Sequence, residues 1–96
     1  MKKFLLLFHG WEEPTPEVMQ AWGAWFGTVG DAFVDSGNPF RGGLEVTKTG
    51  STTLTPEMNP AVAYSIVNAP SLDDAEKLLD GCPIIDSVRV YEAVTM

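Results

Sequence analysis

The only histidine of the chain stands where a catalytic group could be presented. His9 follows the apolar run Phe4–Phe8 and precedes Gly10 and Trp11. Loops at the ends of buried strands often carry function, and an imidazole can accept or donate a proton near neutral pH. The alternative is a structural histidine that is hydrogen-bonded to the backbone. Because the chain has no second histidine and no evident nucleophile motif, both interpretations of His9 stay open.

Three further side chains are candidates for ligand binding: Trp11, Arg41 and Tyr64. Trp11 lies in the loop after the first apolar run and could form an apolar wall. Arg41 lies in the glycine-containing loop 38–43, and a guanidinium group can bind a carboxylate or phosphate through two hydrogen bonds. That loop matches neither the P-loop nor the dinucleotide fingerprint, so a plain turn is the alternative. Tyr64 belongs to the apolar run 61–67 and is the third candidate.

Other kinds of chemistry find little support in the sequence. One histidine and scattered acids show no metal-ligand spacing, and no Gly-x-Ser-x-Gly elbow is present. We therefore expect no metal and no cofactor. Cys82 is the only cysteine, which excludes an intramolecular disulfide and fits a reducing cytoplasm. Its place before Pro83 suggests a buried structural thiol.

The bulk composition narrows the class of protein. Ninety-six residues predict a single domain spanning 1–96, and a hydrophobic content of 45% argues against disorder. A net charge of −7 would repel phosphate backbones, so nucleic acid is an improbable partner. The run Phe4–Phe8 is too short for a membrane span or a signal peptide. We expect a cytoplasmic protein without a membrane partner.

A first helix is predicted after Thr15, which can cap it, with Pro16 at the first helical position. The spacing predicts that the helix continues to Ser36, where Gly37 would take the left-handed position beyond its end. Its helical stripe places Trp22 and Trp25 in the core. The stripe consists of Val18, Trp22, Trp25, Phe26, Val29 and Phe33. Three glycines in this helix, at positions 23, 27 and 30, suggest a close approach to a sheet.

A second helix is predicted from Ser71, whose hydroxyl can cap the amide three residues later, to the Gly81–Pro83 segment. Strands are predicted at Phe4–Phe8, Leu44–Lys48, Ala61–Val67 and Val88–Val94, with a short extended return at Thr52–Thr55. The order strand, helix, strand, strand, helix, strand predicts an α+β fold of the ferredoxin-like type. Such a fold has an antiparallel sheet with two helices on one face.

The strands predict a second copy of the chain. A strand covered on one face alternates apolar and polar residues, whereas Phe4–Phe8 does not alternate and Ala61–Val67 barely does. We therefore expect a homodimer formed sheet against sheet. The alternative is an apolar ligand cavity within a monomer. Arg89 and Tyr91 would point to the face opposite the neighbouring valines, at a subunit interface or a cleft mouth.

Most of the chain resembles the YCII-related family. The resemblance rests on these segments: Lys3–Gly10, Gly37–Phe40, Tyr64–Ala75, Gly81–Pro83 and Val88–Glu92. It implies a dimeric α/β barrel whose biochemical function is largely undefined. Some members carry a histidine at the end of the first strand, which His9 matches, paired with an aspartate. That aspartate has no counterpart here, because Glu57–Pro60 occupies its region.

Together these features predict a protein that binds a small, partly apolar molecule, with Arg41 available for an anionic group. If it is an enzyme, cofactor-free acid–base chemistry of the isomerase or lyase type would use His9. The alternative is a non-catalytic ligand-binding or regulatory dimerisation module.

Overall fold

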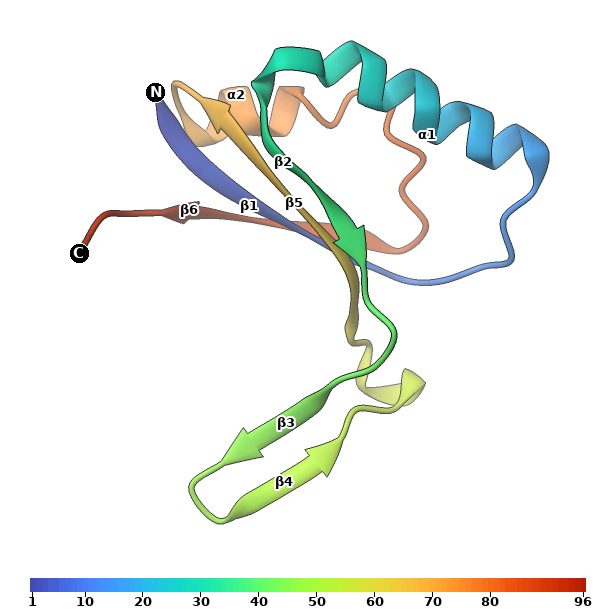
Figure 1. The fold of residues 1–96 in the computed structure, drawn as a ribbon, viewed down its shortest axis with the longest axis vertical. Coiled ribbons are helices and arrows are strands. Elements are labelled where there is room, and N and C mark those ends of the chain that lie inside the picture. Colours follow the sequence, from blue (N-terminus) through green and yellow to red (C-terminus); the bar gives the residue numbers. More distant parts are fainter.

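The computed structural model describes residues 1–96 and is a mixed α+β structure (Figure 1). Four strands form an antiparallel sheet in the order β2-β5-β1-β6, and β3 pairs with β4 in a separate hairpin. None of the helices has the length and apolar content needed to span a membrane. The elements are β1 (Lys2–His9), α1 (Pro16–Val29), η1 (Gly30–Ala32), β2 (Phe33–Pro39), β3 (Leu44–Thr47), β4 (Gly50–Thr53), η2 (Pro56–Met58), β5 (Ala61–Ala69), α2 (Leu72–Lys77) and β6 (Ser87–Ala93).

The sheet is covered on one face only. Figure 1 shows α1 and α2 on the same side of it, as the sequence predicted. Side chains alternate along β1, so Phe4, Leu6 and Phe8 are buried against the helices, while Leu5 and Leu7 on the other face are only partly buried. The uncovered face of the isolated chain therefore carries an apolar centre of Leu5, Leu7 and Ile66, with polar side chains such as Arg89 beside it.

The first helix begins as predicted and is anchored by one tryptophan. The amide of Val18 donates to the Thr15 hydroxyl oxygen at 3.2 Å, which caps the helix. Trp25 is only 2% exposed, and its indole N–H donates to the carbonyl oxygen of Leu78 at 2.7 Å. Since Leu78 directly follows α2, this bond joins the two helical segments across the core.

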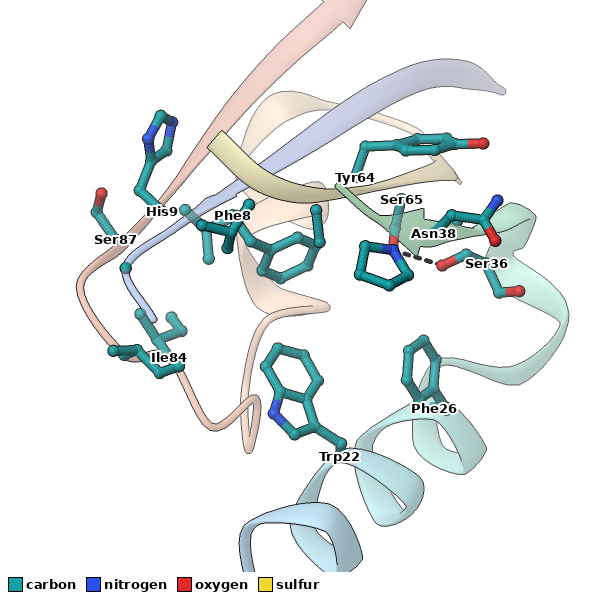
Figure 2. A pocket seen from close by; sticks show the side chains of 17 residues that line it. Phe8, His9, Trp22, Phe26, Ser36, Asn38, Tyr64, Ser65, Ile84 and Ser87 are labelled. Atoms are coloured by element: carbon teal, nitrogen blue, oxygen red, sulfur yellow. Dashed lines mark hydrogen bonds between the residues drawn. The ribbon is translucent and has the colours of Figure 1, made fainter. Parts of the chain in front are cut away.

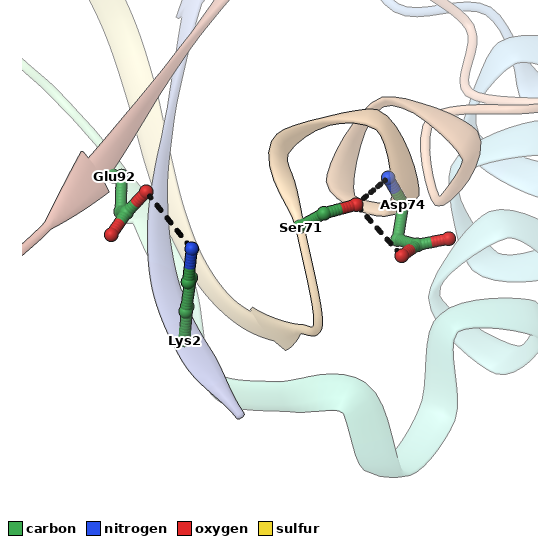
Figure 3. Close-up of polar contacts among 4 residues, drawn as sticks. All are labelled: Lys2, Ser71, Asp74 and Glu92. Atoms are coloured by element: carbon green, nitrogen blue, oxygen red, sulfur yellow. Dashed lines mark hydrogen bonds and ion pairs between the residues drawn. The ribbon is translucent and has the colours of Figure 1, made fainter.

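The second helix has the predicted cap. The Ser71 hydroxyl oxygen accepts from the amide of Asp74 at 3.2 Å and donates to the carboxylate of the same residue at 2.8 Å (Figure 3). Figure 3 also shows Lys2 of β1 near Glu92 of β6, with 4.0 Å between the charged groups. Both side chains are exposed, so this pair contributes little to stability.

The predicted end of the first helix is wrong. The helix α1 ends at Val29 and is followed by Gly30 at φ +53°, while Phe33–Pro39 forms strand β2. The pairing of β2 with β5 is interrupted by two register shifts. A Cβ at Gly37 would overlap the carbonyl oxygen of Tyr64, so this glycine permits a close approach within the sheet.

Two related predictions also need correction. The segment Leu44–Lys48 was expected as the second strand of the main sheet, but Leu44–Thr47 pairs only with Gly50–Thr53. Gly23 and Gly27 do not mark a close approach of α1 to the sheet. Both are exposed, and an added Cβ at either position would meet no atom within 4 Å.

The β3–β4 hairpin projects from the body of the protein (Figure 1). All of its residues are exposed, including Leu44 and Val46 at 62% and 74%. The chain is flat, with extents of 42 × 40 × 18 Å, and buries only ten of its 96 residues. Its own core is accordingly small.

Candidate functional site

A cavity of about 200 Å³ lies between α1 and the sheet, near the end of β1 (Figure 2). Strands β1, β2, β5 and β6 contribute to it, as do α1 and the segment before β6. Its lining consists of Phe8, His9, Gly10, Trp22, Phe26, Ser36, Gly37, Asn38, Pro39, Val62, Ala63, Tyr64, Ser65, Ile84, Ile85, Ser87 and Val88.

Three aromatic rings form one wall of the cavity. The helix α1 presents Trp22 and Phe26 on the same face because they are four residues apart. The Trp22 ring meets Phe8 edge to face, with 5.6 Å between ring centroids, and lies 6.2 Å from Phe26. Trp25 lies in the core as predicted, whereas Trp22 packs against the core and also borders the cavity.

The cavity offers few polar groups and no charged carboxylate, ammonium or guanidinium group. Its lining contains no Asp, Glu, Lys or Arg. The buried hydroxyl of Ser65 already donates to the carbonyl oxygen of Ser36 at 2.7 Å (Figure 2). An anionic ligand would leave its hydration shell without gaining a counter-charge here, so the cavity suits an uncharged molecule.

His9 borders the cavity, but its imidazole points away from the aromatic wall. Figure 2 shows the His9 ring on the opposite side of β1 from the Phe8 ring, as strand alternation requires. The ring Nδ1 lies 3.0 Å from the carbonyl oxygen of Asn59. Since a carbonyl can only accept, Nδ1 carries the proton, and Nε2 of the neutral ring is left as an acceptor.

The Nε2 atom of His9 is buried and has no hydrogen-bond partner. The whole residue is 6% exposed. Buried polar atoms are usually paired, so an unpaired acceptor is an exception that calls for a reason. A strand-end imidazole fixed in one tautomer, with a free lone pair, is able to accept a proton or a hydrogen bond.

Asn59 is placed by the short turn η2. Its backbone takes the left-handed conformation, with φ 49° and ψ 57°, and its amide donates to the carbonyl oxygen of Pro56 at 3.1 Å. Asparagine tolerates this conformation better than most residues. The contact of this turn with His9 was not predicted from the sequence.

The other predicted ligand-binding residues are dispersed. Tyr64 borders the cavity, but its hydroxyl donates to the Asp35 carboxylate at 2.8 Å and its ring stacks on Phe40. Trp11 is 72% exposed and Arg41 is also exposed, and neither lines the cavity. The structure thus brings His9 and Tyr64 to one cavity, but does not bring Trp11 and Arg41 there.

Four residues of the site were not predicted as site residues from the sequence. They are Trp22 and Phe26 of α1 and the hydrogen-bonded serines Ser36 and Ser65. Trp22 and Phe26 lie at helical spacing, which in the sequence indicates a core face as readily as a cavity wall. Ser65 was visible as the one polar residue of an apolar strand. A polar residue within an apolar strand was therefore the one signal in the sequence for Ser65. Its hydrogen-bond partner Ser36 lies in β2, a strand that was not predicted.

The free thiol of Cys82 does not supply a nucleophile in this structure. Burial raises the pKa of Cys82 from 9.0 to about 12, so the thiol stays protonated near neutral pH. No group of three or more histidine, cysteine, aspartate or glutamate side chains is arranged to hold a metal ion.

Comparisons of the chain with protein-family models, curated proteins and solved structures found no match. A functional assignment therefore has to rest on the geometry of the cavity and of His9.

Proposed function

We propose that this protein binds a small, uncharged, largely apolar molecule in the cavity between α1 and the sheet. The observation that carries the proposal is a cavity of about 200 Å³ walled by Phe8, Trp22 and Phe26 and free of charged side chains. Apolar cavities of roughly 150 Å³ in proteins can stay dry and bind benzene. The present volume accordingly suits a ligand with one aromatic or alicyclic ring.

A second candidate function is cofactor-free acid–base chemistry of the isomerase or lyase type, with His9 as the base. It is supported by the unpaired Nε2 and by the hydrogen bond that fixes the proton on Nδ1. Because His9 is only 6% exposed, a substrate would reach Nε2 only after a local movement of the chain around it.

We further propose that the fold is ferredoxin-like, that the chain is related to the YCII-related family and that it forms a homodimer through the open sheet face. The strand order β2-β5-β1-β6 and the two helices on one side support the first point. The dimer is supported by the partly buried Leu5, Leu7 and Ile66 on the uncovered face. The single free cysteine fits a cytoplasmic location.

Titration with toluene and with benzoate tests the binding proposal. The two probes have similar size and differ in charge. In nitrogen-15 NMR spectra, toluene should shift the indole resonance of Trp22, assigned with a Trp22→Phe variant, and benzoate should not. Equal shifts with both probes, or no shift with toluene, would contradict binding of an uncharged ligand.

A further inference from the structure

A second hollow lies outside the cavity, in a groove between α2 and β6. It has a volume of about 550 Å³ and a mixed lining. Five lining residues are apolar, three are acidic and none is basic. They are Leu72, Leu79, Ile84, Val88 and Val90, with Asp73, Glu76 and Asp80. The three acids are exposed, so a bound molecule could reach them.

The strand that borders this groove is an unprotected edge of the sheet. In the order β2-β5-β1-β6, strand β6 has a neighbour on one side only. Its pairing with β1 runs without a register shift, and its seven residues include no proline. The opposite edge differs, because β2 has two register shifts and ends in Pro39. Such bulges and prolines hinder the addition of another strand, and β6 lacks both.

We propose that β6 and the groove together form a docking site for an extended, basic peptide segment of another protein. The segment would add to the sheet as a strand beside β6 through backbone hydrogen bonds. Its apolar side chains, and the aliphatic stems of its lysines or arginines, would cover Val88, Val90 and Leu79. The charged ammonium or guanidinium groups of these side chains would lie near Glu76 and Asp80.

Charge complementarity selects this occupant over a second copy of the chain. The groove has only negative ionisable groups, and the whole chain has a net charge of −7. Two such grooves brought edge to edge would place acids near acids. A basic segment gains attraction from the same groups, which makes binding dependent on salt.

The test uses a blocked, fluorescent lysine–valine heptapeptide matched in length to β6, Lys-Thr-Val-Thr-Val-Thr-Lys, whose lysines and valines share one face of a strand. Fluorescence anisotropy would compare the intact protein with a Glu76→Gln, Asp80→Asn variant. The matched control is a Glu12→Gln, Glu13→Gln variant, since these acids are exposed and lie outside the groove. All four side chains are exposed, and circular dichroism would verify folding.

The proposal predicts that the groove variant binds the lysine–valine peptide about tenfold more weakly, while the control variant binds it as the intact protein does. It also predicts amide NMR shifts along β6 and none along β2. Equal weakening in both variants, equal binding of a glutamate–valine peptide, or no binding would overturn it. A crystal structure in which β6 of a second copy pairs with β6 would also overturn it, because a second copy would then occupy the edge.

Discussion

The imidazole of His9 and the backbone of Asn59 meet although they are 50 residues apart, with Nδ1 3.0 Å from the carbonyl oxygen. This hydrogen bond ties the end of β1 to the turn that leads into β5. It also determines which ring nitrogen is free to act as an acceptor. The structural and the chemical interpretations of His9 therefore concern different atoms of the same ring.

Two substitutions of His9 separate these roles. An asparagine side chain can retain an N–H near the position of Nδ1 but has nothing in place of Nε2. His9→Asn should therefore be more stable than His9→Ala by about 1 kcal/mol in denaturant unfolding. Equal loss of stability in both variants would show that the bond to Asn59 contributes nothing. If His9 acts as a base, both variants should lose any turnover found for the intact protein.

Cavity filling should remove ligand binding without a general loss of structure. Ala63 lines the cavity and lies opposite Phe8 in the sheet, so Ala63→Phe would place a ring in the ligand volume. We expect toluene binding to fall at least tenfold in NMR titrations. Ala24→Phe is the matched control, because Ala24 is exposed on α1 and outside the lining. Undiminished binding by a folded Ala63→Phe variant would place the toluene site elsewhere.

Two glycine substitutions should change stability in opposite directions. Gly23→Ala adds a methyl group to an exposed helical position where nothing lies within 4 Å, and should raise stability by about 0.5–1 kcal/mol. Gly37→Ala would collide with the carbonyl oxygen of Tyr64 at a positive φ of 90° and should lower stability by more than about 2 kcal/mol. Thermal unfolding of both variants measures these effects. A neutral Gly37→Ala would contradict the close approach of β2 to β5.

The pKa of the Cys82 thiol predicts a loss of stability at alkaline pH. Below pH 9 the thiol is protonated in both states. Between pH 9 and about 12 the unfolded thiol ionises while the folded one, raised by burial, keeps its proton. The unfolded state then binds fewer protons, so the free energy of unfolding falls as pH rises. Denaturant unfolding should show a steeper decline above pH 9 for the intact protein than for Cys82→Ser. Identical slopes would count against burial of the thiol.

The open sheet face predicts a homodimer. Leu7 lies in the middle of that face, between Tyr64 and Arg89 on the neighbouring strands. Leu7→Glu should convert a dimer into a monomer in sedimentation velocity, because a carboxylate buried in the interface loses its hydration and an ion pair with Arg89 does not restore it in full. Leu72→Glu is the control, since Leu72 is an exposed apolar residue of α2 on the other side of the sheet. A monomeric intact protein, or a dimer that only Leu72→Glu disrupts, would contradict this assembly.

The helix starts and the central strands could be predicted from the sequence, because they depend on residues close together in the chain. Thr15 and Ser71 are short-range caps, and both hydrogen bonds are present. The central strands β1 and β5 contain the apolar runs Phe4–Phe8 and Ala61–Val67, so their burial could be predicted from composition. The position of His9 at the end of β1 followed directly from that first strand.

The strand β2 could not be predicted in the same way. Its sequence around Asp35–Asn38 contains turn-forming residues, which favour the end of a helix when considered alone. Pairing with β5, the bond from Tyr64 to Asp35 and the close approach at Gly37 depend on residues nearly thirty positions away. The part of the cavity lining that comes from β2 could not be predicted for the same reason, because Ser36 and Pro39 border the cavity only once β2 is in the sheet.

The measurement that tests the central claim most directly is a crystal structure of the protein grown with iodobenzene, recorded with anomalous scattering from the iodine. The account predicts an iodine peak within the cavity, among Phe8, Trp22 and Phe26. An empty or collapsed cavity, with iodine only at the molecular surface, would contradict the assignment of a small-molecule site.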